Sequence, residues 1–265
     1  MRKPRQAALL ASGNAPACPV LRAFVQAEAI GPVASTSLRV ASRIVNTMRA
    51  GIAVPSVEEF QDCPLLLISV PARSAESAVA QLAAAPLDWK RHTVILIGSD
   101  AHSLAPIARL GAVTGLLAAV PGFEERRFIL EGERVALRAL RPLLAGQGVQ
   151  VILLPPGGRA RFDAGVSLAG HVMFPMLAAA GAAFDSTRLP RHLTDSVLEK
   201  TVQRAVRTWR RSRRRGWSIP GGNEIPAQIA ALKEADPLAG AYLHSVAAAG
   251  LRFMRSDGEG LPDQQ

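Results

Sequence analysis

The sequence predicts an α/β protein in which a doubly wound parallel sheet is followed by a second domain made only of helices. Short apolar runs bounded by turn residues alternate with longer amphipathic stretches as far as Leu154, which is a βαβα pattern. After the turn at 155–158 no convincing strand follows. We therefore expect domains at 1–156 and 157–254, with a frayed tail at 255–265.

The strand candidates are short and rich in aliphatic residues. The runs within 65–70 and 94–97 are continuously apolar, as central parallel strands covered on both faces are. Strands are expected at 6–11, 31–35, 51–54, 64–70, 93–98, 113–120, 127–131 and 149–154.

The stretches between the strands carry apolar residues at helical spacing. In 134–145, for example, Leu140 and Leu144 share a stripe with arginines opposite. Ser56 followed by Glu59 resembles a capping box that opens a short helix. Helices are expected at 19–29, 38–49, 75–84 and 134–145, and in the second domain at 161–184, 194–215, 227–234 and 237–254.

Composition favours a folded protein of a reducing cytoplasm. Apolar residues make up 49% of the 265 residues and charged residues 20%, which argues against disorder. The two cysteines, Cys18 and Cys63, show neither a metal-ligand spacing nor a disulfide framework. We expect no membrane span, because no segment approaches about 20 uninterrupted apolar residues. The apolar run after the basic N-terminus is short and broken, so no signal peptide is expected.

The net charge of +10 is concentrated in one arginine-rich stretch. Such a stretch, with Trp209 and Trp217 for stacking, can bind nucleic acid, an anionic substrate or an acidic partner protein. It equally fits a helix whose cationic end complements the macrodipole and whose tryptophans pack on the core. A single basic run more often marks a solvated face, so the pattern disfavours nucleic-acid binding. The residues are Arg204, Arg207, Arg210, Arg211, Arg213, Arg214 and Arg215.

The stretch "LLASGNAP" lies between the first strand and the first helix, where a dinucleotide-binding protein has its phosphate loop. That loop uses three glycines, and here Ala11, Gly13 and Pro16 stand at the three positions. Proline can begin a helix, but Pro16 and Pro19 remove N–H donors near a pyrophosphate. We interpret the stretch as a modified phosphate loop, in which binding is either retained or lost. The candidate ligands are Ser12, Gly13 and Asn14.

The end of the second strand bears on the choice of dinucleotide. An NAD site offers an acidic side chain to the ribose, and none is present here. Ser35 and Thr36, followed by Arg39 and Arg43, suit a 2′-phosphate, so NADP is the expected cofactor. The alternative is a helix N-cap at Ser37 with two solvated arginines.

Several stretches resemble known families. "LLLISVPARS" (65–74) resembles the strand and turn of 6-phosphogluconate-dehydrogenase-like, pyrroline-carboxylate-reductase-like and ketopantoate-reductase-like proteins. The stretch 128–171 is similar to a bacterial group of Rossmann-like proteins with a helical C-terminal domain of unknown function, and "WSIPGGNEIPAQIAAL" and "DPLAGAYLHSVAAAGL" fit that group's closing segments. The resemblance implies a Rossmann-like first domain, NADP-dependent hydride transfer, and homodimers formed through the C-terminal helices, with 164–183 as the interface.

The resemblance also implies positions around the cofactor. Val70 and Pro71 would lie over its middle, with Ser99 at the end of the next strand. The chain departs from its relatives here, since Ala72 and Arg73 follow where an acidic residue is usual. Val120 also stands where the relatives have a histidine before proline.

Further departures fall on the first C-terminal helix. Arg159 stands where a lysine is common, Asp163 where a histidine is, and His171 where an asparagine is. Asp163 and His171 are eight positions apart, roughly on one helix face, and with Arg159 they are the candidate catalytic residues. The alternative is a core histidine and a capping carboxylate. No paired histidine spacing predicts a metal site.

Two classes of function stay open. The first is an NADP-type oxidoreductase that acts on an unknown small substrate held between the domains. The second is a catalytically silent relative that serves as an interaction or assembly subunit, which the loss of motif residues favours. Binding of nucleic acid or another polyanion through the basic helix is a further alternative.

Overall fold

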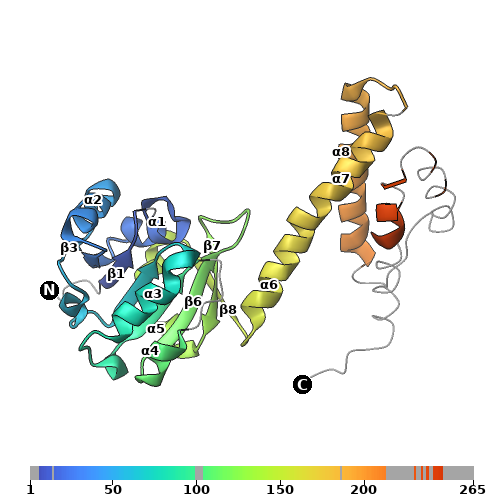
Figure 1. Cartoon of the computed structure of the whole chain (residues 1–265). Coiled ribbons are helices and arrows are strands. Elements are labelled where there is room, and N and C mark those ends of the chain that lie inside the picture. Colours follow the sequence, from blue (N-terminus) through green and yellow to red (C-terminus); the bar gives the residue numbers. More distant parts are fainter. Residues whose placement is uncertain are drawn as a thin grey trace, which may run out of the picture. The chain divides into compact units, whose positions relative to one another are not determined.

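The computed structural model describes residues 6–13, 15–98, 104–185 and 187–212, together with 230, 234, 237–238 and 241–246 (Figure 1). Contacts divide the chain into two compact units, Met1–Val166 and Ser167–Gln265, which are called unit 1 and unit 2 below. The arrangement is the expected α/β domain followed by a helical domain.

Unit 1 is built on one sheet with the strand order β3-β2-β1-β4-β5-β6-β7-β8. The first six strands are parallel, and the chain reverses its direction of winding between β1 and β4. All eight predicted strands are present. Their bounds are β1 Ala7–Ala11, β2 Ile30–Ala34, β3 Ile52–Ala53, β4 Leu65–Ser69, β5 Thr93–Ile97, β6 Val113–Ala119, β7 Arg127–Gly132 and β8 Gln150–Leu154.

The sheet is not wholly parallel, because β7 runs antiparallel to β6 and β8 runs parallel to β7. The link between β6 and β7 spans only 120–126. A parallel neighbour needs a crossover of roughly a dozen residues or more, so this link permits only a hairpin-like return. As a result β8 ends at the edge of the sheet where the parallel strands begin.

Helices cover both faces of the sheet. On α2, the Ser37 side chain accepts a hydrogen bond from the amide of Val40, and Arg49 ends the helix in the left-handed conformation. The helix α4 was not predicted, because five residues show no helical period. The helices are α1 Pro19–Gln26, α2 Leu38–Met48, α3 Ala72–Ala83, α4 Ala105–Arg109 and α5 Arg134–Leu144.

Alternate residues of the central strands feed two separate hydrophobic cores. Leu67 on β4 packs in the core that includes Phe24 of α1 and Leu140 of α5. Its neighbour Leu66 packs in the core that includes Val79 of α3. Successive strand side chains point to opposite faces, so a strand covered on both sides must be apolar throughout. This is why the continuous apolar runs were reliable strand signals.

The described part of unit 2 is helical apart from the link at 187–190. One helix runs from Gly158 to Asp185 and comprises α6 Gly158–Ser167, a π-helical turn at Leu168–Val172, and α7 Met173–Asp185. It is followed by α8 Arg191–Ser212. The residues described between 230 and 246 are also helical, whereas the predicted tail lies outside the described residues.

The helix Gly158–Asp185 is long and apolar enough to cross a membrane by length and composition, although no such segment was expected from the sequence. A core helix of a soluble protein passes the same test. No residue of α7 is buried in the chain as described. A helix that is apolar all round requires an apolar neighbour.

Gly51 is predicted to be irreplaceable, since its φ is +83° and an added Cβ would lie 2.7 Å from the carbonyl oxygen of Gly31. Gly122 is the matched control, because its φ is +77° but an added Cβ there meets nothing within 4 Å. We expect Gly122→Ala to lower the free energy of unfolding by about 1 kcal/mol, the cost of left-handed strain. Gly51→Ala should cost roughly 3 kcal/mol or more, since the clash adds to the strain. Equal losses in urea unfolding would contradict this assignment.

Candidate functional site

The candidate site lies where the parallel strands of unit 1 end. In open α/β sheets ligands bind outside the carboxyl ends of the strands, at the point where the winding reverses. In this sheet that point lies between β1 and β4. The loop after β1, the end of β2 and the turn after β4 surround it, and they contain most of the predicted cofactor-binding residues.

The loop after β1 is tied to the neighbouring strand. The amide of Ser12 donates to the carbonyl oxygen of Ser69 at 3.1 Å, and the amide of Ala15 donates to that of Ser12 at 2.9 Å. A 3₁₀ turn, Ala15–Ala17, then precedes α1, and Cys18 at its N-cap makes no side-chain cap bond. The regular helix therefore begins only at Pro19, after this extra turn.

Gly13 provides the open approach in this loop. Its residue is exposed, and an added Cβ would meet no atom within 4 Å. An added Cβ at Gly98, at the end of β5, would likewise meet no atom within 4 Å. Two backbone segments at the carboxyl edge are therefore accessible to a ligand. Asn14 and Ser99, which were also predicted as ligands, lie outside the described residues.

The hydroxyl groups after β2 have different roles. The Oγ of Ser35 donates to the carbonyl oxygen of Ala11 at 2.6 Å and so joins the ends of β2 and β1. Ser37 is the N-cap of α2, as one of the two interpretations of the sequence held. Thr36 remains exposed and makes neither contact. Of the predicted pair Ser35 and Thr36, only Thr36 has a hydroxyl group free of structural hydrogen bonds in the described chain.

Arg39 and Arg43 are exposed on α2, one helical turn apart. Neither forms an ion pair with an acidic residue in the part of the chain that the structure describes. Their positive charges are therefore uncompensated beside the end of β2. These residues fit a phosphate on the ribose, and the open backbone at Gly13 fits the approach of a pyrophosphate.

The turn after β4 places mainly backbone groups, and few polar side chains, at the candidate site. Pro71 is the N-cap of α3 and provides no side-chain cap, while the amide of Ser74 donates to the carbonyl oxygen of Pro71 at 2.8 Å. Val70 and Pro71 are half-buried at the carboxyl edge, and Arg73 is exposed beside them. The turn is thus in the predicted place, without the acidic residue of the relatives.

The loop at 120–126, which follows β6, is braced by charged residues. Glu124 accepts a hydrogen bond from the amide of Gly122 at 2.7 Å. That bond, with one from its own amide, lowers the pKa of the Glu124 carboxyl. Glu125 lies 4.0 Å from the guanidinium of Arg22 on α1, and Arg127 lies over the ring of Phe123 at 4.7 Å. The loop is therefore held over the start of α1, with Phe123 half-exposed.

The three predicted catalytic residues do not form one cluster. Arg159 and Asp163 are paired, with the Nε of Arg159 2.8 Å from both carboxylate oxygens of Asp163. Arg159 is only 4% exposed, and its Nη1 is buried without a partner among the described residues. The carboxylate of Asp163 is thereby committed to the arginine rather than to a histidine.

His171 lies in the π-helical turn and is exposed. Asp163 and His171 are eight residues apart on one continuous helix, which is about 12 Å along its axis. A direct hydrogen bond between them does not fit this spacing, and their position on a shared helix face stays a prediction.

Glu131 is the polar residue here that the sequence reasoning missed. Its carboxylate accepts hydrogen bonds from the amides of Gly157, at 2.5 Å, and Arg159, at 2.9 Å. A carboxylate in this position satisfies free amides and the positive end of the helix dipole. It lies 26 residues away in the chain, so no local capping pattern reveals it.

Cys63 and His92 lie outside this site, just before β4 and β5, where the parallel strands begin. The Nδ1–H of His92 donates to the carbonyl oxygen of Cys63 at 2.9 Å. Burial, with a smaller effect of Asp62, raises the pKa of the Cys63 thiol, which disfavours the reactive thiolate. Within the described ranges, no three metal-ligating side chains gather.

Solved structures share this fold across nearly the whole chain. An imine reductase from Aspergillus terreus in complex with NADPH4 and dibenz[c,e]azepine is 13% identical, with a TM-score of 0.71 and 95% of each chain covered. An imine reductase variant from Myxococcus stipitatus in complex with NAD+ is 13% identical, with a TM-score of 0.70 and 94% of each chain covered. A reductive aminase from the same Aspergillus species, in complex with NADPH and ethyl levulinate, is 14% identical, with a TM-score of 0.67 and 96% and 95% coverage.

These likenesses confirm the predicted fold class. The chain has a Rossmann-like N-terminal domain and a helical C-terminal domain, as those structures do. No protein-family model matches it, and a search of curated proteins finds no significant relative. At this identity the fold is shared, and the chemistry has to be argued from the residues.

We predict that the Glu131 cap stabilises the start of α6. Glu131→Gln keeps the shape of the side chain but removes its charge, and should lower the free energy of unfolding by about 1–2 kcal/mol. Glu76→Gln is the matched control, because Glu76 is exposed on α3 beyond its first turn and its side chain forms no described hydrogen bond or ion pair. Urea unfolding followed by circular dichroism measures both variants. A Glu76→Gln loss as large as that of Glu131→Gln would show that general charge, not the cap, is responsible.

Proposed function

We propose that unit 1 binds NADP at the carboxyl edge of its parallel strands, and that the protein is an oxidoreductase acting on an unknown small substrate. The observation that carries the proposal is the end of β2, where no carboxylate is present and Arg39 and Arg43 are exposed and unpaired among the described residues. The fold shared with structures named as NADPH and NAD+ complexes supports it.

Different residues of the site have different tasks in this proposal. Arg39 and Arg43, with the hydroxyl of Thr36, would hold the 2′-phosphate through charge-assisted hydrogen bonds. Gly13 would let the pyrophosphate approach the backbone. Ser35 acts indirectly, because its hydroxyl joins β2 to β1 and so positions the loop. When bound, NADPH would supply the hydride.

The polar groups at the start of the long helix do not lie at the cofactor edge of the same sheet. The helix α6 begins where β8 ends, beside Glu131, at the edge where the parallel strands begin. Arg159 is 4% exposed there and is held by two short contacts with Asp163. In this proposal both residues therefore position the helix and do not touch the substrate. His171 is exposed, and its imidazole is the candidate proton donor.

The cofactor proposal predicts that NADPH, and NADH more weakly, raises the melting temperature of the wild-type protein. Gly13→Asp should abolish both responses, because its carboxylate repels the pyrophosphate. The fold should survive, since an added Cβ meets no atom within 4 Å. Arg39→Glu with Arg43→Glu should weaken NADPH at least about tenfold and leave NADH nearly unchanged.

The control for these variants is Arg91→Glu, an exposed charge reversal at the opposite edge of the sheet, before β5. It should leave both responses intact. If the wild-type protein responds to neither dinucleotide at millimolar concentration, the oxidoreductase proposal fails and the silent interaction subunit becomes the better explanation. NADPH binding that survives Gly13→Asp would refute the loop assignment.

We also infer that the protein is a homodimer that pairs through its helical unit. All residues of α7 except the terminal Asp185 are apolar, and none is buried in the single chain. Phe174 is 71% exposed and Leu168, six residues earlier, is 63% exposed. Burial of large apolar side chains is the main driving force of stable association. The expected small-molecule substrate, cytoplasmic location and acidic protein partner remain proposals.

The dimer proposal predicts that Phe174→Glu yields a monomer, because a charge cannot be buried unpaired in an apolar interface. Leu110→Glu is the matched control, since Leu110 is 43% exposed in unit 1. Sedimentation velocity should show a dimer for the wild type and for Leu110→Glu. A wild-type monomer at every concentration tested would remove this proposal.

The exposure of the arginines on α8 favours a solvated helix face over a nucleic-acid-binding surface. Arg204, Arg207, Arg210 and Arg211 are exposed, whereas Leu198 and Val202 of the same helix line a cavity against α7. The helix is thus amphipathic, with the arginines outside. The remaining arginines of the basic stretch, Arg213, Arg214 and Arg215, lie outside the described residues.

A further inference from the structure

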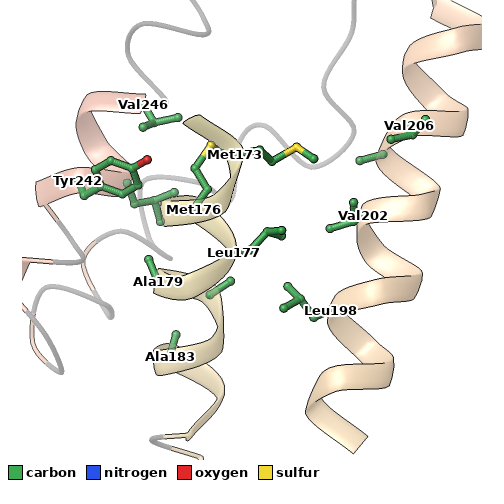
Figure 2. Close-up of a pocket in the computed structure, with 13 residues that line it drawn as sticks. Met173, Met176, Leu177, Ala179, Ala183, Leu198, Val202, Val206, Tyr242 and Val246 are labelled. Atoms are coloured by element: carbon green, nitrogen blue, oxygen red, sulfur yellow. The ribbon is translucent and has the colours of Figure 1, made fainter. Parts of the chain in front are cut away.

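Unit 2 contains an apolar cavity of about 440 Å³. Its walls come from α7, α8 and the helical segment at 241–246 (Figure 2). Figure 2 shows Leu177 of α7 pointing toward Leu198 and Val202 of α8, and Tyr242 on the other side of α7. The cavity lies entirely within unit 2, so it is distinct from the carboxyl edge of the sheet.

The wall has a simple chemistry. Of the described residues that line the cavity, all but one are Ala, Val, Leu or Met. The exception is Tyr242, the single tyrosine of the chain. Tyr242 is half-buried, and its hydroxyl has no hydrogen-bond partner among the described residues. The wall therefore offers a large apolar surface and one polar group that can both donate and accept.

The size of the cavity is that of a ligand site. Small-molecule sites in proteins are clefts or cavities of roughly 300–1,000 Å³ that are lined mostly by apolar side chains. This hollow is partly open to solvent, since none of its lining residues is fully buried, so a ligand can enter it. Met173 and Met176 add adaptability, because methionine side chains adjust to irregular shapes.

We propose that this cavity binds an uncharged, largely apolar compound that presents one hydrogen-bonding group to the hydroxyl of Tyr242. A charged ligand is disfavoured, since the described wall holds no opposite charge to compensate its desolvation. Phe174 and Leu168, the exposed residues on which the dimer proposal rests, do not line the hollow, although other residues of α7 do. The proposal is independent of dinucleotide binding in unit 1.

The probe for the test is N-phenyl-1-naphthylamine, an uncharged two-ring-system amine with one N–H group and fluorescence that rises in apolar surroundings. The full chain should bind it saturably, with one probe per chain. Ala180→Trp and Ala205→Trp each place a large ring in the cavity, from α7 and α8, and should abolish saturable binding. Tyr242→Phe keeps the ring and should weaken binding about fivefold, the effect of one hydrogen bond.

Leu193→Ala is the control, because Leu193 is 44% exposed on α8 and does not line the cavity. It should bind the probe as the wild type does. Two filling positions on different helices, each checked by circular dichroism and thermal melting, keep the test valid if one variant fails to fold.

Three results would overturn the proposal: no saturable binding to the wild type, binding that persists in every folded filling variant, or binding that disappears as the chain self-associates. The last would assign the cavity to an interface between copies. A negative NADPH titration would leave this result unaffected, so the two proposals fail separately.

Discussion

The carboxylate of Glu131 caps the start of the longest helix in the part of the chain that the structure describes. It stands at the end of β7 and receives the amides of Gly157 and Arg159, so the first turn of α6 is held against the sheet. The same contact orients the backbone of Arg159, whose side chain then closes on Asp163 one turn later. The helix that leads from unit 1 into unit 2 therefore begins with its first amides hydrogen-bonded and with a negative charge beside the positive end of its dipole.

In the proposed cofactor site, the loop after β1 would offer fewer amides to a pyrophosphate than a regular phosphate loop. The 3₁₀ turn at Ala15–Ala17 delays α1, and proline at 16 and 19 removes donors that a pyrophosphate would use. Arg39 and Arg43 are exposed charges that would hold the other end of the proposed ligand. Binding would then rest less on short backbone contacts and more on long-range, salt-sensitive ones.

The strands and the fold class could be predicted because their signals are local. A continuous apolar run such as 65–70 indicates a strand covered on both faces, and this can be recognised from neighbouring residues of the sequence alone. The direction of β7 was not predicted, since an apolar run has the same pattern in either direction. α4 was too short to show a period, and the cap by Glu131 joins residues that only the folded chain brings together.

The candidate site was predictable in position but not in role. Gly13, Thr36, Arg39 and Arg43 lie where the strand order placed them, whereas the hydroxyl of Ser35 is used by the neighbouring strand. Asp163 was predicted as an acid or base, although its spacing of four from Arg159 already allowed an ion pair on one helix face. For two opposite charges four residues apart on a helix, an ion pair is the first interpretation to consider, before a catalytic role.

The π-helical turn at Leu168–Val172 sets the rotational phase of the helix that follows it. If the same residues formed regular α-helical hydrogen bonds instead, every later side chain would be rotated by about 100° about the axis. The apolar surface around Phe174 and the cavity wall on α7 would then point in new directions, while the sequence of α7 stayed the same. The one extra residue of the π turn thus sets the rotation about the helix axis between the polar first half of the helix and its apolar second half.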